Sequence, residues 1–366
     1  MFSRKIAQVV SVDKSFPQFE ELTVSMADQI SQAINYPSLT GAALVGDKVV
    51  LNTTAVELTL GSGGFHFVYL NLERLEQPLA GAGHIIKLRY TPAQLRVLSV
   101  EEEQSPHHAI MATATSLLGM PVVSGELHSM LAPVALTIKQ EKPGVRLAYL
   151  MTDGGALPAF FSRTLRELRA REVIIGTITT GHAFGGDLEA VNVFSGLLAA
   201  RYVLKADAAM ICMGPGVAGT GTPFGFSGLE MGENINRIHS LGGHAIALPR
   251  LSFADSRPRH QGLSHHTLTA LATAALAPAD VPLPRLSHPQ DEVIAQQVLT
   301  AGWERHHNLV YYPELSLSHL EPNSVLCTTM GRTLAEDPAF FLGCVAAGVH
   351  LTKLLCNSLV ASEAGS

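Results

Sequence analysis

The sequence has few charged residues and no dense cluster of positive charge. Only 15% of its 366 residues are charged, and the formal net charge is −6. Proteins that bind nucleic acids need a basic surface to neutralise phosphates, so the sequence argues against a nucleic-acid partner. A sparsely charged surface also indicates burial between subunits, and we expect a homo-oligomer, with a two-fold dimer as the first choice.

Cysteine is scarce as well, and long apolar runs are absent. The four cysteines are scattered without a Cys-x-x-Cys pair, which argues against a disulfide framework and against a zinc site built from thiolates. We expect them to be buried as small hydrophobic side chains. No apolar run approaches the roughly 18 residues needed to span a bilayer, and no secretory h-region follows Arg4 and Lys5. The composition therefore favours a cytoplasmic protein without membrane association.

Residues 1–104 have a different pattern from the rest of the chain. Short strand-like runs at residues 49–54 and 65–70 are separated by glycine-rich turns, and no strong helical period is present. We predict a small antiparallel β barrel or sandwich here. In the strand-like run 84–90, alternation puts Lys87 and Arg89 on one face, where they either bind an anionic ligand or form a solvated edge.

From residue 105 to 366, strand-like runs alternate with helix-like segments. The runs at residues 120–123, 146–152, 173–179, 207–213, 244–249 and 324–329 are separated by helical patterns, among them 189–204 and 338–350. This alternation predicts an α/β domain with a mostly parallel, doubly wound sheet and helices on both faces. Each run ends in a polar loop, and ligands of such sheets bind at the carboxyl ends of the strands.

The loop at residues 214–222 is rich in glycine. Gly214, Gly216 and Gly219 match the spacing of the dinucleotide-binding fingerprint, but no helix opens after them and no acidic residue ends the next strand-like run. The match therefore does not predict a nucleotide site of that type. Backbone N–H groups of the loop, with Thr220 and Thr222, could instead hold a phosphate or carboxylate, and a plain tight turn is the alternative.

Two further loops and the helix expected at residues 228–241 supply acids and a histidine. Asp153 follows one strand-like run, and His182 follows the next in a flexible, glycine-flanked position suited to a general base. Asp187 is equally well explained as the cap of the helix expected at residues 189–204. Glu233 lies above the glycine-rich loop, where it either contacts a ligand or forms an exposed salt bridge.

The segment at residues 250–266 carries the strongest chemical signal. It concentrates arginine, histidine and an aspartate after a buried strand-like run. Guanidinium groups suit bidentate binding of phosphate or carboxylate, and histidines in the first turn of a helix are held neutral, as a base or a metal ligand requires. An arginine-rich subunit contact is the alternative. The ligand-binding candidates here are Arg250, Ser252, Arg257 and Arg259, and the catalytic candidates are His260 and His265.

The sequence assigns no metal and no cofactor. Neither His-x-x-x-His nor His-x-His occurs in a metal-site context, the Gly-x-Ser-x-Gly elbow is absent, and so is the phosphate-binding P-loop. If a divalent metal is bound, the candidate ligands are His128, Asp153, His182 and Asp187.

Residues 51–58, 83–92, 181–187 and 250–266 resemble a bacterial family of uncharacterised proteins, the domain of unknown function 3866. The resemblance covers nearly the whole chain. It implies a bacterial cytoplasmic protein, and it brings no established activity, cofactor or catalytic residue.

The convergence of polar loops predicts an enzyme acting on a small anionic substrate, including phosphorylated or nucleotide-like molecules. In this hypothesis the arginines hold the anion, His182 or His265 is the base, and Asp153 or Asp187 orients it. The sequence does not distinguish a transferase from a hydrolase. Two alternatives stay open, a metal-dependent hydrolase and a non-catalytic module that senses a ligand or assembles with a partner.

Overall fold

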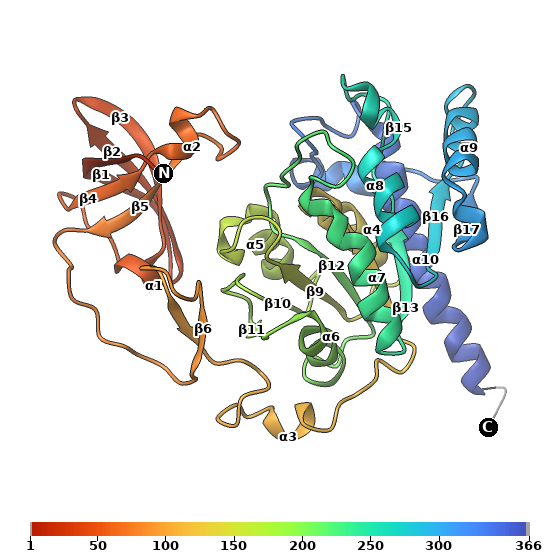
Figure 1. The fold of residues 1–366 in the computed structure, drawn as a ribbon, viewed down its shortest axis with the longest axis horizontal. Helices are drawn as coiled ribbons and strands as arrows, with labels where there is room; N and C mark the ends of the chain where they lie inside the picture. The colour runs from red at the N-terminus through yellow and green to blue at the C-terminus, as the bar shows by residue number, and fades with distance from the viewer. Residues whose placement is uncertain (1, 364–366) are drawn as a thin grey trace. The chain divides into compact units, whose positions relative to one another are not determined.

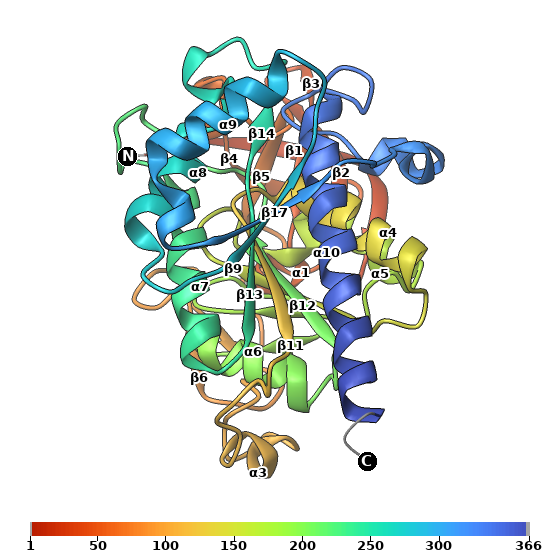
Figure 2. The ribbon, with the colours of Figure 1, turned by 90° about the vertical axis from the view of Figure 1, so that its right-hand side faces the viewer.

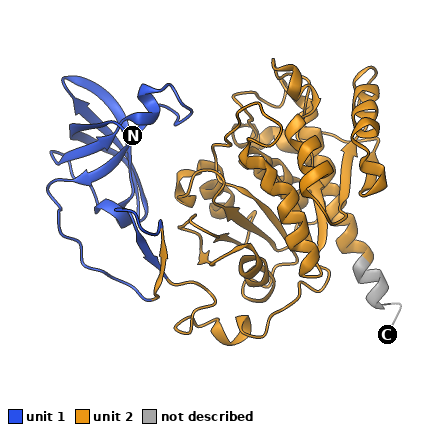
Figure 3. Ribbon diagram, viewed as in Figure 1, with its two compact units in different colours: residues 1–82, 88–97 blue, residues 83–87, 98–366 orange. Residues whose placement is uncertain are grey.

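The computed structural model describes residues 2–363, with side chains described as far as Asn357. The chain forms two compact units, shown in different colours in Figure 3. The first contains the described residues up to Ala82 together with Leu88–Val97. The second contains Gly83–Lys87 and the described residues from Leu98 onward.

The first unit is a closed barrel of five strands, with the order β1-β2-β3-β5-β4 in the described part of the chain. Four neighbouring pairs are antiparallel, whereas β3 and β5 are parallel. One parallel pair is unavoidable, because strand directions cannot alternate around a ring with an odd number of members. The predicted small β barrel is thus confirmed. Its strands are labelled in Figure 1: β1 (Arg4–Phe16), β2 (Phe19–Met26), β3 (Gln29–Asn35), β4 (Lys48–Asn52) and β5 (Phe65–Asn71), with α1 (Pro37–Thr40) and α2 (Thr54–Glu57) between them.

The second unit is built on a parallel sheet, as the alternating pattern predicts. Within the described residues the sheet has eight strands in the order β11-β10-β9-β12-β8-β13-β16-β17, and every pairing is parallel. Every residue of β9 and β12 is buried, because helices cover both faces. The strands are β8 (Pro121–Gly125), β9 (Leu147–Thr152), β10 (Gly176–Thr179), β11 (Leu188–Glu189), β12 (Ala208–Met213), β13 (His244–Leu248), β16 (Asp280–Pro284) and β17 (Asn308–Tyr312).

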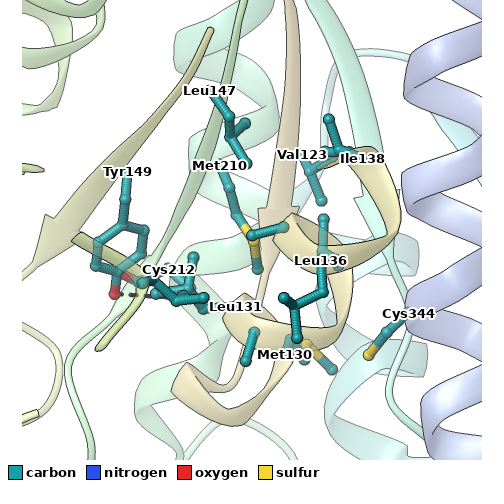
Figure 4. Packing of buried hydrophobic residues seen from close by; sticks show 14 of the residues in the cluster. Val123, Met130, Leu131, Leu136, Ile138, Leu147, Tyr149, Met210, Cys212 and Cys344 are labelled. Atoms are coloured by element: carbon teal, nitrogen blue, oxygen red, sulfur yellow. Dashed lines mark hydrogen bonds between the residues drawn. The ribbon is translucent and has the colours of Figure 1, made fainter. Parts of the chain in front are cut away.

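Each face of the sheet has its own hydrophobic core. Helices α4 (Leu131–Glu141), α5 (Arg163–Ala170) and α10 (Pro338–Glu363) pack on one face. Figure 4 shows Leu131 and Leu136 of α4 between the strand residues Leu147 and Met210 and Cys344 of α10. Helices α6 (Val193–Tyr202), α7 (Glu230–Ser240) and α9 (Gln290–Ala301) pack on the other face. The predicted doubly wound architecture is therefore confirmed.

The connections from β9 and β12 leave in opposite directions. These two strands are neighbours, but β9 leads through α5 to β10 on one side, whereas β12 leads through α7 to β13 on the other. Since crossovers are right-handed, the two helices lie on opposite faces and diverge above the sheet. A crevice is expected at this reversal, at the carboxyl ends of β9 and β12.

Two strands beyond β13 were missed by sequence reasoning. The strand-like runs expected from the sequence include none between residues 250 and 323, but Asp280–Pro284 is strand β16, and β17 follows it. Pro282 and Pro284 have no N–H to donate, which agrees with a single paired position between β13 and β16. The strand expected at residues 324–329 does not form, and 3₁₀ turns occupy Ser318–Leu326 instead.

Helix α10 continues well beyond residue 350, where its end was expected. Pro338–Asn357 is long and apolar enough to cross a membrane by length and composition alone. However, 67% of its most apolar window is buried inside the protein, as in the core helix of a soluble protein. Figure 2 shows this helix running along one face of the sheet.

Candidate functional site

A crevice of about 440 Å³ lies beyond the carboxyl ends of β9 and β10, between α6 and α7. Residues after β9 and β10 form its floor, the amino end of α6 forms one wall, and the first turns of α7 form another. A volume of this size suits a small metabolite. The lining residues are Thr152, Asp153, Thr180, Gly181, Val191, Asn192, Val193, Phe194, Glu230, Glu233 and Arg237.

Glu230 is the titratable group of this crevice with the most altered acidity. Its Oε1 accepts a hydrogen bond of 2.5 Å from Oγ1 of Thr152. Burial raises the pKa of Glu230 to about 7, the Thr152 hydrogen bond opposes this, and the nearby charge of Asp153 adds to it. A carboxyl group with a pKa near neutrality can both give and take a proton, and such groups concentrate at catalytic sites.

The opposite wall of the crevice has the reverse polarity. Asn192 caps α6, with its side chain accepting a hydrogen bond from the Ser195 N–H at 3.1 Å. The remaining N–H groups of the first turn and the helix dipole favour an anion at this end. Arg237 lines the crevice from the α7 side, as Glu230 does, and pairs with Glu233 at 3.0 Å. The crevice therefore has an acidic wall and a wall that attracts negative charge.

Glycines hold the loops after β9 and β12 in close contact. A Cβ atom on Gly155 would lie 2.2 Å from the carbonyl oxygen of Gly214, and one on Gly214 would lie 2.3 Å from the oxygen of Ala156. The Ala156 N–H donates to the Pro215 carbonyl at 2.7 Å, which ties the two loops together. Glycine is required here by close backbone approach.

Replacing Gly155 with alanine is expected to lower the free energy of unfolding by about 1–3 kcal/mol, because the two loops must separate to admit the methyl group. Urea unfolding followed by circular dichroism measures this. Gly144→Ala is the control, since a Cβ there meets nothing within 4 Å. Equal stability of the two variants would contradict the close approach.

Two of the three arginines in the segment at residues 250–266 are neutralised within the protein. Asp255, which is 2% exposed, accepts from Arg250 at 3.1 Å and from Arg257 at 2.8 Å. Hydrogen bonds from Arg257 hold the pKa of Asp255 well below its usual range. A second acid, Asp337, pairs with Arg332 at 3.0 Å and accepts from Ser252 at 2.7 Å. These contacts order the segment, which β14 (Leu251–Ser252) and β15 (Gly262–Leu263) close as a two-stranded ribbon.

Three histidines of the same segment meet at its end, where α8 (His265–Thr269) begins. Their ring centroids lie 4.3–5.1 Å apart. Burial lowers the pKa of His260 to about 4 and that of His266 to about 3. The pKa of His265 is lowered too, mainly by burial and then by Arg259. All three rings are thus neutral at physiological pH.

Glu126 is a second buried carboxyl group at this edge of the sheet. It directly follows β8 and is fully buried, and the side chains of Arg250 and Thr267 stabilise its charged form. Burial raises its pKa to about 7, and the positive charge of Arg250 opposes this shift. Two glutamates with a pKa near 7 therefore lie beyond the carboxyl ends of the central strands.

The glycine-rich loop uses its hydroxyl groups internally. Oγ1 of Thr220 donates to the Gly225 carbonyl at 2.9 Å, and Oγ1 of Thr222 accepts from the Gly225 N–H at 3.1 Å. Gly219 lies against the ring of His266, and Gly221 lies beside the guanidinium of Arg259. The loop thus packs beside the histidines, and its threonines are engaged in its own turn.

Other predicted residues lie outside these groups. His128 is buried and bonded through its two ring nitrogens to Tyr149 at 3.0 Å and to Ser162 at 2.6 Å. Asp187 does not cap a helix, because α6 begins only at Val193; it pairs with Arg169 at 2.9 Å. The suggested metal ligands His128, Asp153, His182 and Asp187 are therefore not among the ligand groups that the described residues bring together.

His182 and Lys87 have structural contacts. The backbone N–H of His182 donates to Oδ2 of Asp153 at 2.9 Å, which fixes the loop after β10 beside the crevice. Lys87 is fully buried, and its ammonium group bonds to Glu189 at 2.7 Å and to the Thr179 and Ala183 carbonyls. Lys87 is thus paired inside the second unit, which differs from both alternatives left open by the sequence, an anionic ligand and a solvated edge.

Sequence reasoning did not select several residues that the structure brings to this edge. Glu126, in the loop after β8, could have been selected from the sequence. A carboxylate directly after a buried strand costs free energy unless it is protonated or paired, which marks it as unusual. The remaining ones depend on which loops face each other. They are Thr152, Glu230, Arg237 and His266.

Comparison with known proteins gives a single family. No curated protein and no solved structure matches the chain. The model of the family described as "Protein of unknown function (DUF3866)" matches residues 32–348, which include both the crevice and the histidines. The resemblance seen in the sequence is confirmed, and the chain belongs to this family of proteins of unknown function, DUF3866.

Proposed function

We propose that this protein is an enzyme that acts on a small anionic substrate bound in the crevice beyond the carboxyl ends of β9 and β10, between α6 and α7. The observation that carries the proposal is the side chain of Glu230. It lines a cavity of metabolite size together with the negatively charged Asp153, and its pKa is raised to about 7. The position of the crevice at the carboxyl ends of parallel strands supports the proposal, since sheets of this type bind ligands at that edge.

The two walls of the crevice suggest how a substrate is oriented. Its anionic group, a phosphate or a carboxylate, lies at the amino end of α6. A hydroxyl or amino group at its other end lies at Glu230 and Thr152, where Glu230 transfers the proton as general acid or base. Asp153 keeps the proton on Glu230 until substrate binds. The reaction class is hydrolysis or group transfer that needs one proton transfer.

Glu230→Gln is expected to lower turnover by about 100-fold or more while ligand binding changes by only a few-fold, because the amide keeps the shape but cannot exchange a proton. The probes are inorganic phosphate, sugar phosphates, nucleoside monophosphates and 2-hydroxy acids, screened by thermal shift. Each compound that stabilises the protein is then incubated with it and followed by NMR. Glu103→Gln is the control, because Glu103 is exposed and lies outside the crevice.

The rival hypothesis is a non-catalytic module that senses a ligand. A compound that raises the melting temperature of the protein but is recovered unchanged after long incubation would support this rival and contradict catalysis. Equal turnover by Glu230→Gln and Glu103→Gln would remove Glu230 from the mechanism. A two-fold dimer and a cytoplasmic location stay predictions from composition.

A further inference from the structure

The three clustered histidines have the arrangement of a metal-binding group. One ring nitrogen from each of His260, His265 and His266 lies within 4.8 Å of those of the other two. A separation of this order allows one ion to contact all three after small side-chain rotations. Three neutral imidazoles are a common ligand set for catalytic zinc, which keeps a fourth position for water.

Two of these rings have buried nitrogens that the protein does not use. Within the described residues, Nε2 of His265 and Nδ1 of His266 have no hydrogen-bond partner. His266 is only 5% exposed, so water does not freely satisfy its ring. A buried polar atom without a partner costs free energy, and two of them in one cluster indicate a missing ligand.

Neighbouring residues fix the rings as the outer shell of a metal site does. The hydroxyl of Ser264 lies 2.8 Å from Nδ1 of His260 and accepts the backbone N–H of His266 at 3.2 Å. The ring of Phe226 stacks on His266 with centroids 4.0 Å apart and meets His265 edge-on. Such contacts hold the tautomer and the orientation of metal-binding histidines.

Positive charge around the cluster is mostly compensated. Arg250 and Arg257 pair with Asp255, and Arg332 pairs with Asp337. Among the described residues, Arg259 forms no ion pair, and it lies close enough to lower the pKa of His265. One uncompensated guanidinium disfavours a bare cation, but it favours hydroxide or another anion as the fourth ligand.

We propose that His260, His265 and His266 together bind one divalent transition metal ion of the zinc class. The other ligand-like group, His244 with Asp280 and His350, lacks the corresponding signal. There Asp280 accepts from His244 at 2.6 Å and from His350 at 2.8 Å, and Tyr312 bonds the other nitrogen of His350 at 2.9 Å. Hydrogen bonds within the protein satisfy that group.

The experiment is titration of the full-length protein with ZnCl₂ in an isothermal calorimeter, after metal removal by dialysis. Wild-type protein is expected to bind one equivalent. Loss of an outer-shell partner commonly weakens metal binding by 10–100-fold, so His265→Ala and His266→Ala are each expected to weaken it by about 100-fold or more. His244→Ala is the matched control and is expected to bind as the wild type does.

A second readout uses Co²⁺, whose visible absorption reports four- or five-coordinate geometry. The wild type and His244→Ala are expected to give the bands, and His265→Ala is expected to lose them while its circular dichroism stays native. Folded wild-type protein that binds no metal overturns the proposal, and so does binding that His244→Ala removes instead. This test does not depend on Glu230, because it measures binding and not turnover.

Discussion

Replacing Asp255 with alanine is expected to lower the free energy of unfolding by about 3–5 kcal/mol at pH 7. Asp255 and Arg250 are each 2% exposed, so the change leaves a buried guanidinium without its counter-ion. Arg257 loses its hydrogen bonds to the same carboxylate. Urea unfolding monitored by circular dichroism measures the difference from the wild type.

Glu167→Ala is the matched control for Asp255→Ala. Glu167 pairs with Arg171 at 2.9 Å, but both side chains are exposed, so its loss is expected to cost no more than about 1 kcal/mol. The pKa of Asp255 is depressed, so its contribution is complete above about pH 4 and fades as the pH falls through the native pKa. The difference in the free energy of unfolding between Asp255→Ala and the wild type should therefore become smaller at acidic pH. A loss below 1 kcal/mol at pH 7 would show that the ion pair is not buried.

The parallel sheet could be predicted because its central strands are continuous apolar runs. Ala208–Met213 is buried at every position and is bounded by Asp207 and Gly214, so its pattern is clear. Asp280–Pro284 is buried too, but its two prolines are typical of a loop. Only its neighbours in the sheet make it a strand. The local sequence pattern thus predicts strands such as Ala208–Met213, which are apolar throughout. It misses strands such as Asp280–Pro284, which form only because neighbouring strands pair with them.

The candidate site could be predicted only as a set of polar loops. The sequence does not determine the strand order, and the order decides which loops meet. Because β12 lies between β9 and β8, Asp153 faces Glu230 rather than His128. His128 is instead buried and bonded to Tyr149 and Ser162. The polar loops at this edge of the sheet therefore form two distinct groups, one lining the crevice and one holding the histidine cluster. The spacing of residues along the chain cannot show this division.

The second large effect is expected from Glu126→Gln, which should change how the free energy of unfolding depends on pH. Burial raises the native pKa of Glu126 to about 7, whereas the unfolded chain has the usual value of about 4.3. Between these values the native state keeps a proton that the unfolded state releases, so the wild type loses stability as the pH rises. At 1.36 kcal/mol per pKa unit, the loss from this group is about 3–4 kcal/mol between pH 4 and pH 8. Glutamine does not titrate, and its variant should lack this loss.

The measurement is urea unfolding of Glu126→Gln and the wild type at pH 5 and at pH 8. Other titrating groups contribute equally to both proteins, so the difference between the two pH values isolates Glu126. At pH 8 the free energy of unfolding of Glu126→Gln is expected to rise relative to that of the wild type. Glu103→Gln, which changes an exposed residue, should have the stability of the wild type at both pH values. If Glu126→Gln and the wild type change in parallel, the carboxylate is already ionised beside Arg250 at pH 5. In that case Glu126 would be a permanent counter-ion of the arginine segment. It would then hold no proton near neutral pH that could take part in chemistry at this edge of the sheet.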